Sequence, residues 1–169
     1  MRVGIGYDIH RFDGPASGRG VRNRPLKLGG VVIPHARGLV GHSDADVLLH
    51  AVADALFGAV GAPDIGEQFP SSNARYRNAD SRAFLKAAKA AVRRKGWAIG
   101  NIDATVVADA PRLTGHKYKM SRAIGKLLAI PAADVSVKAK TTEGFAPGKQ
   151  GIAAHAVVLL TKRKGRGAG

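Results

Sequence analysis

The feature that most constrains this chain is an apolar stretch whose ionisable side chains recur every four residues. Between residues 46 and 59 these are only Asp46, His50 and Asp54, which share one face of a helix. The apolar residues fit one helical face: Val47, Leu48, Ala51, Val52, Ala55, Leu56 and Ala59. We expect Ser43 as the N-cap of this helix, because Asp46 follows three residues later, and Gly61 and Pro63 as its end.

The rest of the chain alternates between strand and helix patterns. We expect helices at 81–95 and 117–128, and strands at 2–9, 26–33, 102–108, 135–141 and 152–160. The predicted order is therefore β-β-α-α-β-α-β-β. The simplest packing is an α+β fold, in which the helices cover one face of a mixed sheet. We expect one domain over residues 1–160 and a disordered basic tail over 161–169.

Composition limits the chemistry. The chain has no cysteine, so a metal would be held by His and carboxylate side chains. No apolar run is long enough to span a bilayer, and Arg2 is followed at once by a strand-like pattern rather than a signal peptide. We expect a cytoplasmic protein without membrane contact.

The formal net charge is +15. The four cationic side chains of residues 161–169 account for part of it, and the remaining +11 is scattered along the chain. Either a polyanionic small substrate or a nucleic acid would explain such an excess. Only 5% of the residues are aromatic, and no interleaving of aromatic and basic residues indicates base stacking. Nucleic acid is therefore disfavoured as the main partner.

A metal site is predicted near residues 8–10. Asp8 and His10 are two apart in a strand and point the same way. His50 would complete three ligands and leave a fourth tetrahedral position open, with Asp46 or Asp54 orienting its ring. The alternatives are an ordinary hydrogen-bonded Asp–His pair and a solvated polar stripe, although such stripes usually contain Lys, Arg or Glu.

Two segments have the residue types of phosphate sites. Residues 41–44, Gly-His-Ser-Asp, precede the apolar helix, where backbone amides favour anions. Residues 138–143, Lys-Ala-Lys-Thr-Thr-Glu, end a strand with two hydroxyls, two lysines and a carboxylate suited to Mg²⁺. The alternatives are plain helix capping by Ser43 and an exposed strand end.

Several motifs together resemble the 2-C-methyl-D-erythritol 2,4-cyclodiphosphate synthase family. They occur in the family's order from Arg2 to about Leu160: GYDIH at 6–10, GHSDAD at 41–46 with His50, DIG at 64–66, FP at 69–70, ADAPR at 108–112 and VKAKTTE at 137–143. The resemblance implies a zinc-dependent cyclising phosphorus-oxygen lyase of non-mevalonate isoprenoid biosynthesis. Its substrate would be 4-diphosphocytidyl-2-C-methyl-D-erythritol 2-phosphate, and its products the cyclic diphosphate and CMP.

The resemblance also implies roles for single residues. Asp8, His10 and His50 match the Zn²⁺ ligands, and Glu143 matches the ligand of a second divalent cation, Mg²⁺ or Mn²⁺. His42 and Thr141 match the catalytic residues. The remaining matches are substrate contacts: Ile9, Ser43, Asp64, Ile65, Gly66, Phe69, Ala108, Asp109, Ala110, Pro111, Arg112, Lys140, Thr142 and Phe145. Asp8, His10, His42, Thr141 and Glu143 would touch substrate as well. Family members are homotrimers with active sites between subunits.

The chain departs from the family pattern at three places. The segment 143–145 is two residues shorter than usual, and residues 147–151 read Pro-Gly-Lys-Gln-Gly where the family has Gly-Arg-Gly-Glu-Gly. Residues 69–73, Phe-Pro-Ser-Ser-Asn, have fewer carboxylates than the common family pattern. Two other functions stay open at this point, a zinc phosphoesterase that admits water and a nucleic-acid-binding module.

Overall fold

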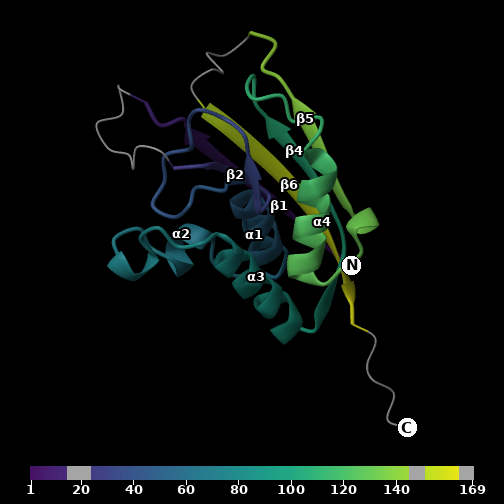
Figure 1. Cartoon of the computed structure of the whole chain (residues 1–169). Helices are drawn as coiled ribbons and strands as arrows, with labels where there is room; N and C mark the ends of the chain where they lie inside the picture. Colours follow the sequence, from purple (N-terminus) through teal and green to yellow (C-terminus); the bar gives the residue numbers. More distant parts are fainter. Residues whose placement is uncertain (15–23, 145–150, 164–169) are drawn as a thin grey trace.

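The main sheet of the fold is mixed and has four strands (Figure 1). The computed structural model describes residues 1–14, 24–144 and 151–163. The sheet has the order β1-β6-β4-β5. Strands β1 and β4 are antiparallel to β6, whereas β4 and β5 are parallel. The strands are β1 (Arg2–Arg11), β4 (Trp97–Val107), β5 (Val135–Lys140) and β6 (Gly151–Lys162).

Helices cover one face of this sheet (Figure 1). They are α1 (Val47–Ala59), α3 (Arg82–Arg94) and α4 (Lys117–Leu128). Side chains alternate along each strand, and the inward set joins the helices in one core, as Ile152, Ala154, Ala156 and Val158 do on β6. The expected α+β class, with a mixed sheet and helices on one face, is confirmed.

Strand β1 packs closely on helix α1. Its inward positions begin with Gly4 and Gly6, and a Cβ on either would lie 2.0 Å from a backbone oxygen of α1, that of Ala55 or Ala51. Only glycine allows this approach of the two backbones. The outward side chains of β1 are apolar and exposed: Val3, Ile5, Tyr7 and Ile9.

The predicted strand over 26–33 is instead a hairpin. Strands β2 (Leu26–Leu28) and β3 (Val31–Ile33) form a separate two-stranded sheet. The turn residues Gly29 and Gly30 have φ of 61° and 76°, a conformation that reverses the chain within two residues. Strand β1 pairs with β6 and not with this hairpin.

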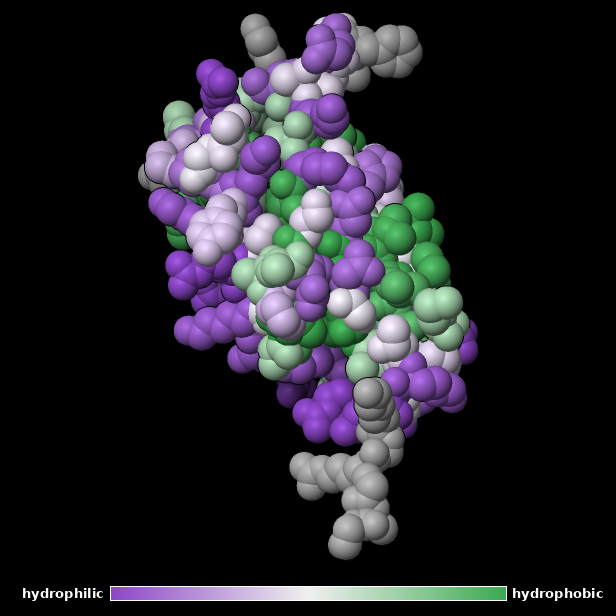
Figure 2. Space-filling model, turned by 90° about the vertical axis from the view of Figure 1, so that its right-hand side faces the viewer, coloured by the Kyte–Doolittle hydropathy of each residue, from purple (hydrophilic) through white to green (hydrophobic). Residues whose placement is uncertain are grey.

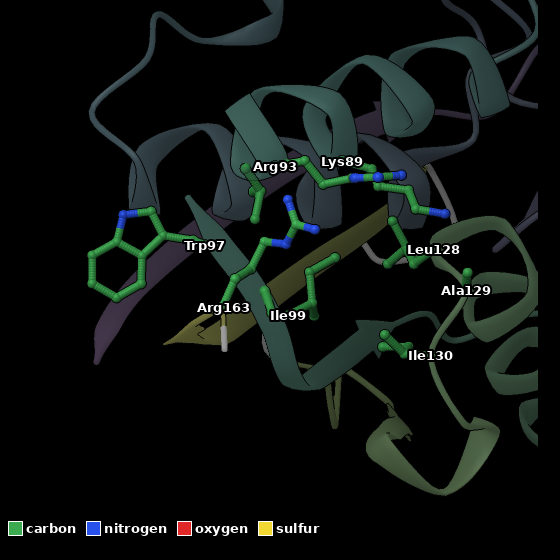
Figure 3. A pocket seen from close by; sticks show the side chains of 10 residues that line it. Lys89, Arg93, Trp97, Ile99, Leu128, Ala129, Ile130 and Arg163 are labelled. Atoms are coloured by element: carbon green, nitrogen blue, oxygen red, sulfur yellow. The ribbon is translucent and has the colours of Figure 1, made fainter. Parts of the chain in front are cut away.

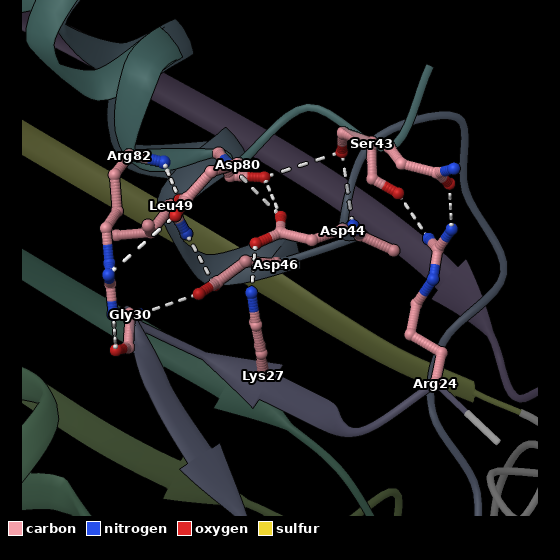
Figure 4. Close-up of polar contacts among 12 residues, drawn as sticks. Arg24, Lys27, Gly30, Ser43, Asp44, Asp46, Leu49, Asp80 and Arg82 are labelled. Atoms are coloured by element: carbon pink, nitrogen blue, oxygen red, sulfur yellow. Dashed lines mark hydrogen bonds and ion pairs between the residues drawn. The ribbon is translucent and has the colours of Figure 1, made fainter. Parts of the chain in front are cut away.

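The N-cap of α1 was wrongly predicted. The cap is Asp46 and not Ser43, because the Asp46 carboxylate accepts a hydrogen bond from the Leu49 amide at 3.1 Å. The same buried carboxylate accepts the amides of Gly29 at 2.8 Å and Gly30 at 2.6 Å. Figure 4 shows how Asp46 joins the hairpin turn to the start of α1.

Three other boundaries differ from the sequence prediction. Residues 64–78, where no helix or strand is predicted, contain the short helix α2 (Ile65–Gln68) and a 3₁₀ turn (Ala74–Tyr76). Strand β4 begins five residues early, at Trp97. Strand β6 continues to Lys162, which pairs with Trp97, so the expected boundary at residue 160 lies inside a strand. Residues 164–169 of the predicted tail lie outside the described part.

None of the helices in residues 1–14, 24–144 and 151–163 has both the length and the apolar character needed to cross a membrane.

The contact between β1 and α1 predicts the effect of adding a single methyl group. Gly6→Ala should lower the free energy of unfolding by about 1–3 kcal/mol, because the new Cβ must push the two backbones apart. Gly115→Ala is the control, since nothing lies within 4 Å of its Cβ position. Urea denaturation measures both, and equal stability of Gly6→Ala and the unaltered protein would contradict the packing argument.

Candidate functional site

Asp8, His10 and His50 meet where β1 faces α1. The Oδ2 atom of Asp8 lies 3.0 Å from Nε2 of His10 and 2.8 Å from Nδ1 of His50. The two ring nitrogens are 3.2 Å apart. All three potential ligand atoms lie within 4.8 Å of one another. The structure therefore brings together the three residues predicted to bind a metal.

The outer nitrogen of each ring determines which atom faces the cluster. Nδ1 of His10 lies 2.8 Å from the carbonyl oxygen of Val40, which can only accept, so this nitrogen carries a proton. In the neutral ring Nε2 then carries the lone pair that a metal ion in the cluster would accept. Nε2 of His50 lies 2.8 Å from the Ser81 hydroxyl, which leaves Nδ1 to face the cluster.

The electrostatics of the cluster favour a positive charge. Burial opposes ionisation of Asp8, but its contacts with His10 and His50 outweigh burial and hold the pKa of Asp8 well below its usual range. Burial lowers the pKa of His10, but Asp8, the Val40 carbonyl and the charge of Asp46 together raise it by more, so the net pKa lies above its usual value. Two imidazole nitrogens and a carboxylate oxygen are a donor set that fits a divalent metal.

The acidic residues predicted to orient His50 bind elsewhere. Asp46 holds the amides of Gly29 and Gly30, and Asp54 accepts the amide of Ile65 at 2.9 Å. The outer nitrogen of His50 instead contacts the hydroxyls of Ser81 at 2.8 Å and Ser43 at 3.1 Å. In the sequence, Ser81 is recognisable only as the start of a helix. Its position 31 residues from His50 gives no local periodicity by which to find it.

The turn before α1 is held from outside. Arg24 donates to the carbonyl oxygens of Gly41 and Ser43 and to the Asn78 side chain. Figure 4 shows its guanidinium group pointing toward Ser43. The backbone N–H of Asn78 donates to the His42 carbonyl at 2.7 Å. The Nε2 atom of His42 is buried and has no hydrogen-bond partner among the described residues. This nitrogen is therefore available to a ligand at the turn.

A second cluster lies at the ends of the parallel strands β4 and β5. The loop 108–112, which contains Ala108, Asp109, Ala110, Pro111 and Arg112, adjoins Lys140, since the Ala108 amide donates to the Lys140 carbonyl at 2.9 Å. Asp109 accepts the amide and hydroxyl of Thr142 at 2.7 and 2.8 Å. Thr141 donates to Glu143, whose side chain is exposed. Phe145 lies outside the described residues.

A third group of predicted contacts surrounds α2. Asp64 caps this helix by accepting the Glu67 amide at 2.8 Å, and Ile65 and Gly66 form its first turn. Phe69 follows α2 and packs on Phe84, with 4.7 Å between the two ring centroids. The ring centroids of Phe84 and His50 are 5.8 Å apart. These residues thus adjoin the metal cluster, whereas the Ile9 side chain lies on the opposite face of β1 and is 59% exposed.

The first two clusters share one end of the sheet but not one position on it. Ile9 is level with Ala153, Ala153 with Val107, and Val107 with Lys140. Three strand spacings therefore separate β1 from β5, roughly 14 Å. Within one chain, the cluster of Asp8, His10 and His50 and the side chain of Glu143 lie at the same end of the sheet but on different strands.

A separate pocket of about 350 Å³ lies at the other end of the sheet (Figure 3). Basic and apolar side chains line it, among them Lys89, Arg93, Trp97, Leu128 and Arg163. The described lining includes neither a carboxylate nor a histidine. It is therefore unsuited to hold the predicted metal.

Comparison with known proteins shows the family of this chain. Residues 1–161 match the model of the YgbB family. A Syntrophomonas wolfei protein named 2-C-methyl-D-erythritol 2,4-cyclodiphosphate synthase is 52% identical over 162 residues, which cover 95% of this chain and 98% of that one. A Pseudomonas aeruginosa protein of the same name is 50% identical, over 96% of this chain and 100% of that one.

Solved structures give the same result. A structure of 2C-methyl-D-erythritol-2,4-cyclodiphosphate synthase has a TM-score of 0.83 at 36% identity and covers 95% of this chain and 100% of its own. A Plasmodium falciparum protein solved as a CDP complex has a TM-score of 0.81 at 32% identity, over 96% of this chain and 97% of its own. The family resemblance inferred from the motifs is confirmed.

The metal cluster makes a direct prediction. Purified protein expressed with zinc should contain about one metal ion per chain by elemental analysis, because the three donor atoms already converge. His50→Ala should lose most of it. His35→Ala removes an imidazole outside the cluster and should keep it. A full metal content in His50→Ala would contradict the assignment of His50 as a ligand.

Proposed function

The chain belongs to the YgbB family, and we propose that it converts 4-diphosphocytidyl-2-C-methyl-D-erythritol 2-phosphate into 2-C-methyl-D-erythritol 2,4-cyclodiphosphate and CMP. In this reaction an oxygen of the 2-phosphate attacks the β-phosphorus, and the bond from the β-phosphorus to the oxygen of CMP breaks. The observation that carries the proposal is the cluster of Asp8, His10 and His50 beside the turn 41–44, in a chain matched along residues 1–161.

Asp8, His10 and His50 would hold Zn²⁺ as three protein ligands. Bound there, the ion would withdraw charge from an oxygen of the β-phosphate. The protein keeps both rings in the required orientation through the Val40 carbonyl and the Ser81 hydroxyl. Because the rings are already held, little side-chain freedom is lost when a ligand arrives.

His42 and Ser43 would bind phosphate at the turn. The buried Nε2 of His42 lacks a partner in the described part of the chain, and a phosphate oxygen would accept a hydrogen bond from it. Arg24 fixes the carbonyls of this turn from behind, so the turn need not rearrange to receive an anion. Fixed donors of this kind stabilise charge that develops in a transition state.

The second cluster would bind the nucleotide and a second cation. Glu143 offers an exposed carboxylate suited to Mg²⁺ or Mn²⁺, and Thr141 donates to it. Asp109 ties the loop 108–112 to Thr142 through two hydrogen bonds. This loop would contact the cytosine, while Asp64, Gly66 and Phe69 would contact the erythritol portion next to the zinc cluster.

We also propose a homotrimer whose active sites lie between chains. Roughly 14 Å of sheet separates the metal cluster from Lys140 within one chain, which is too far for one compact diphosphate to touch both ends. The exposed outer face of the sheet offers an apolar interface, with Val3 65%, Ile5 73% and Ile9 59% exposed. Figure 2 shows that apolar residues gather on one side of an otherwise largely hydrophilic view.

Product analysis tests the reaction. Incubation with the cytidine-linked substrate should release CMP and the cyclic diphosphate in equal amounts, as followed by phosphorus NMR. His42→Ala should lower kcat by about a hundredfold or more, because a fixed donor to the phosphate is lost, while the metal content stays unchanged. A linear phosphate product would instead identify a hydrolase and overturn the cyclase proposal.

Subunit mixing tests the shared site. His50→Ala and Glu143→Ala chains, each inactive alone, should regain activity when co-expressed, since about one quarter of the sites in randomly mixed trimers then draw both intact residues from different chains. Co-expressed Asp8→Ala and His50→Ala chains are the control, because both residues belong to the same chain's cluster. No recovery in trimers proved to be mixed would contradict site sharing.

A further inference from the structure

Ser81 lies between His50 and a carboxylate outside the metal cluster. Its side chain is fully buried. Its hydroxyl oxygen lies 2.8 Å from Nε2 of His50, and the hydroxyl donates to Oδ1 of Asp44. Oδ2 of Asp44 in turn binds the Lys27 ammonium at 3.0 Å. A continuous chain of polar contacts thus runs from β2 to the ring of His50.

The hydroxyl of Ser81 is not used for helix capping. Ser81 occupies the N-cap position of α3, where a serine side chain ordinarily accepts an amide hydrogen bond. Here it makes no such bond, and Asp80 accepts the Arg82 amide at 2.9 Å instead. The Ser81 hydroxyl points toward His50 and Asp44, so its position serves the cluster rather than the helix.

Counting protons gives the direction of each hydrogen bond. Burial raises the pKa of Asp44, but the hydrogen bonds of Ser81 and Lys27 outweigh it and lower the net pKa, so the carboxylate is ionised and only accepts. The single hydroxyl proton of Ser81 therefore goes to Asp44. Its oxygen is left to accept from Nε2 of His50, so Nε2 carries the proton of the neutral ring and Nδ1 presents its lone pair.

We propose that Ser81 is a positioning residue of the metal centre, which holds His50 in the tautomer and orientation that offer Nδ1 to the metal. The inference deepens the proposed function and rests on its metal site. Ser81 acts through His50 and contributes no ligand atom. Asp44 sets the direction of the Ser81 hydroxyl and also belongs to the turn 41–44, so one carboxylate joins the phosphate-binding turn to the metal ligand.

The Ser43 hydroxyl limits the size of the effect. Its oxygen lies 3.1 Å from Nε2 of His50 and already accepts the Ala45 amide at 3.1 Å. When Ser81 is removed, Ser43 can replace part of the lost hydrogen bond. Loss of such an outer partner typically weakens metal affinity by about ten- to a hundredfold, and we expect Ser81→Ala in the lower half of that range.

The test compares zinc affinity in full-length Ser81→Ala, Ser121→Ala and unaltered protein by competition with a chromophoric chelator. Ser121 is also buried but lies on α4, so Ser121→Ala controls for loss of a buried hydroxyl. Ser81→Ala should raise the zinc Kd about ten- to thirtyfold, and Ser121→Ala should leave it unchanged. Thermal unfolding of the zinc-loaded proteins shows whether each variant is folded.

Nitrogen NMR of the zinc-loaded proteins tests the tautomer of His50. We expect zinc on Nδ1 of His50 and a slowly exchanging proton on Nε2, and faster exchange of that proton in Ser81→Ala. Zinc on Nε2, or equal zinc affinity in Ser81→Ala and unaltered protein, overturns the role of Ser81 alone. Absence of zinc from the unaltered protein overturns the proposed metal site as well.

Discussion

The close approach of β1 to α1 is the contact on which the site depends. Gly4 and Gly6 let the strand lie against the helix backbone, and the same inward face then continues into Asp8 and His10. His50 comes from the helix that this approach brings near. A larger residue at either glycine position would push β1 away from α1. It would thereby move Asp8 and His10 away from His50 without contacting any of the three. Packing and ligand geometry are therefore one constraint in this protein.

Sequence periodicity was sufficient to predict that Asp8, His10 and His50 could lie together. Asp8 and His10 follow from the two-residue repeat of a strand, and His50 from the four-residue repeat of a helix. It could not predict Ser81, because that contact joins residues 31 positions apart through the packing of α3 on α1. The N-cap of α1 was misassigned for a similar reason. Ser43, Asp44 and Asp46 are all good capping residues, and the amides of the hairpin turn decide between them.

The two clusters also differ in how completely one chain builds them. The cluster of Asp8, His10 and His50 and its outer contacts with Val40 and Ser81 lie within a single chain. The loop 108–112 and Glu143 are tied to each other but not to that cluster. In the proposed trimer, each chain would therefore contribute a finished metal-binding half and a finished nucleotide-binding half, and assembly would only bring the halves together.

The two faces of strand β1 have different surroundings, since one packs on α1 and the other is exposed. Gly4, Gly6, Asp8 and His10 face the helix, while Val3, Ile5, Tyr7 and Ile9 face outward. Since side chains alternate strictly, inserting or deleting one residue would turn the apolar set inward and turn Asp8 and His10 outward. Such a change would disrupt both faces at once, whereas a substitution disturbs only one. The length of this strand is therefore less free to vary in evolution than the identity of its outward residues.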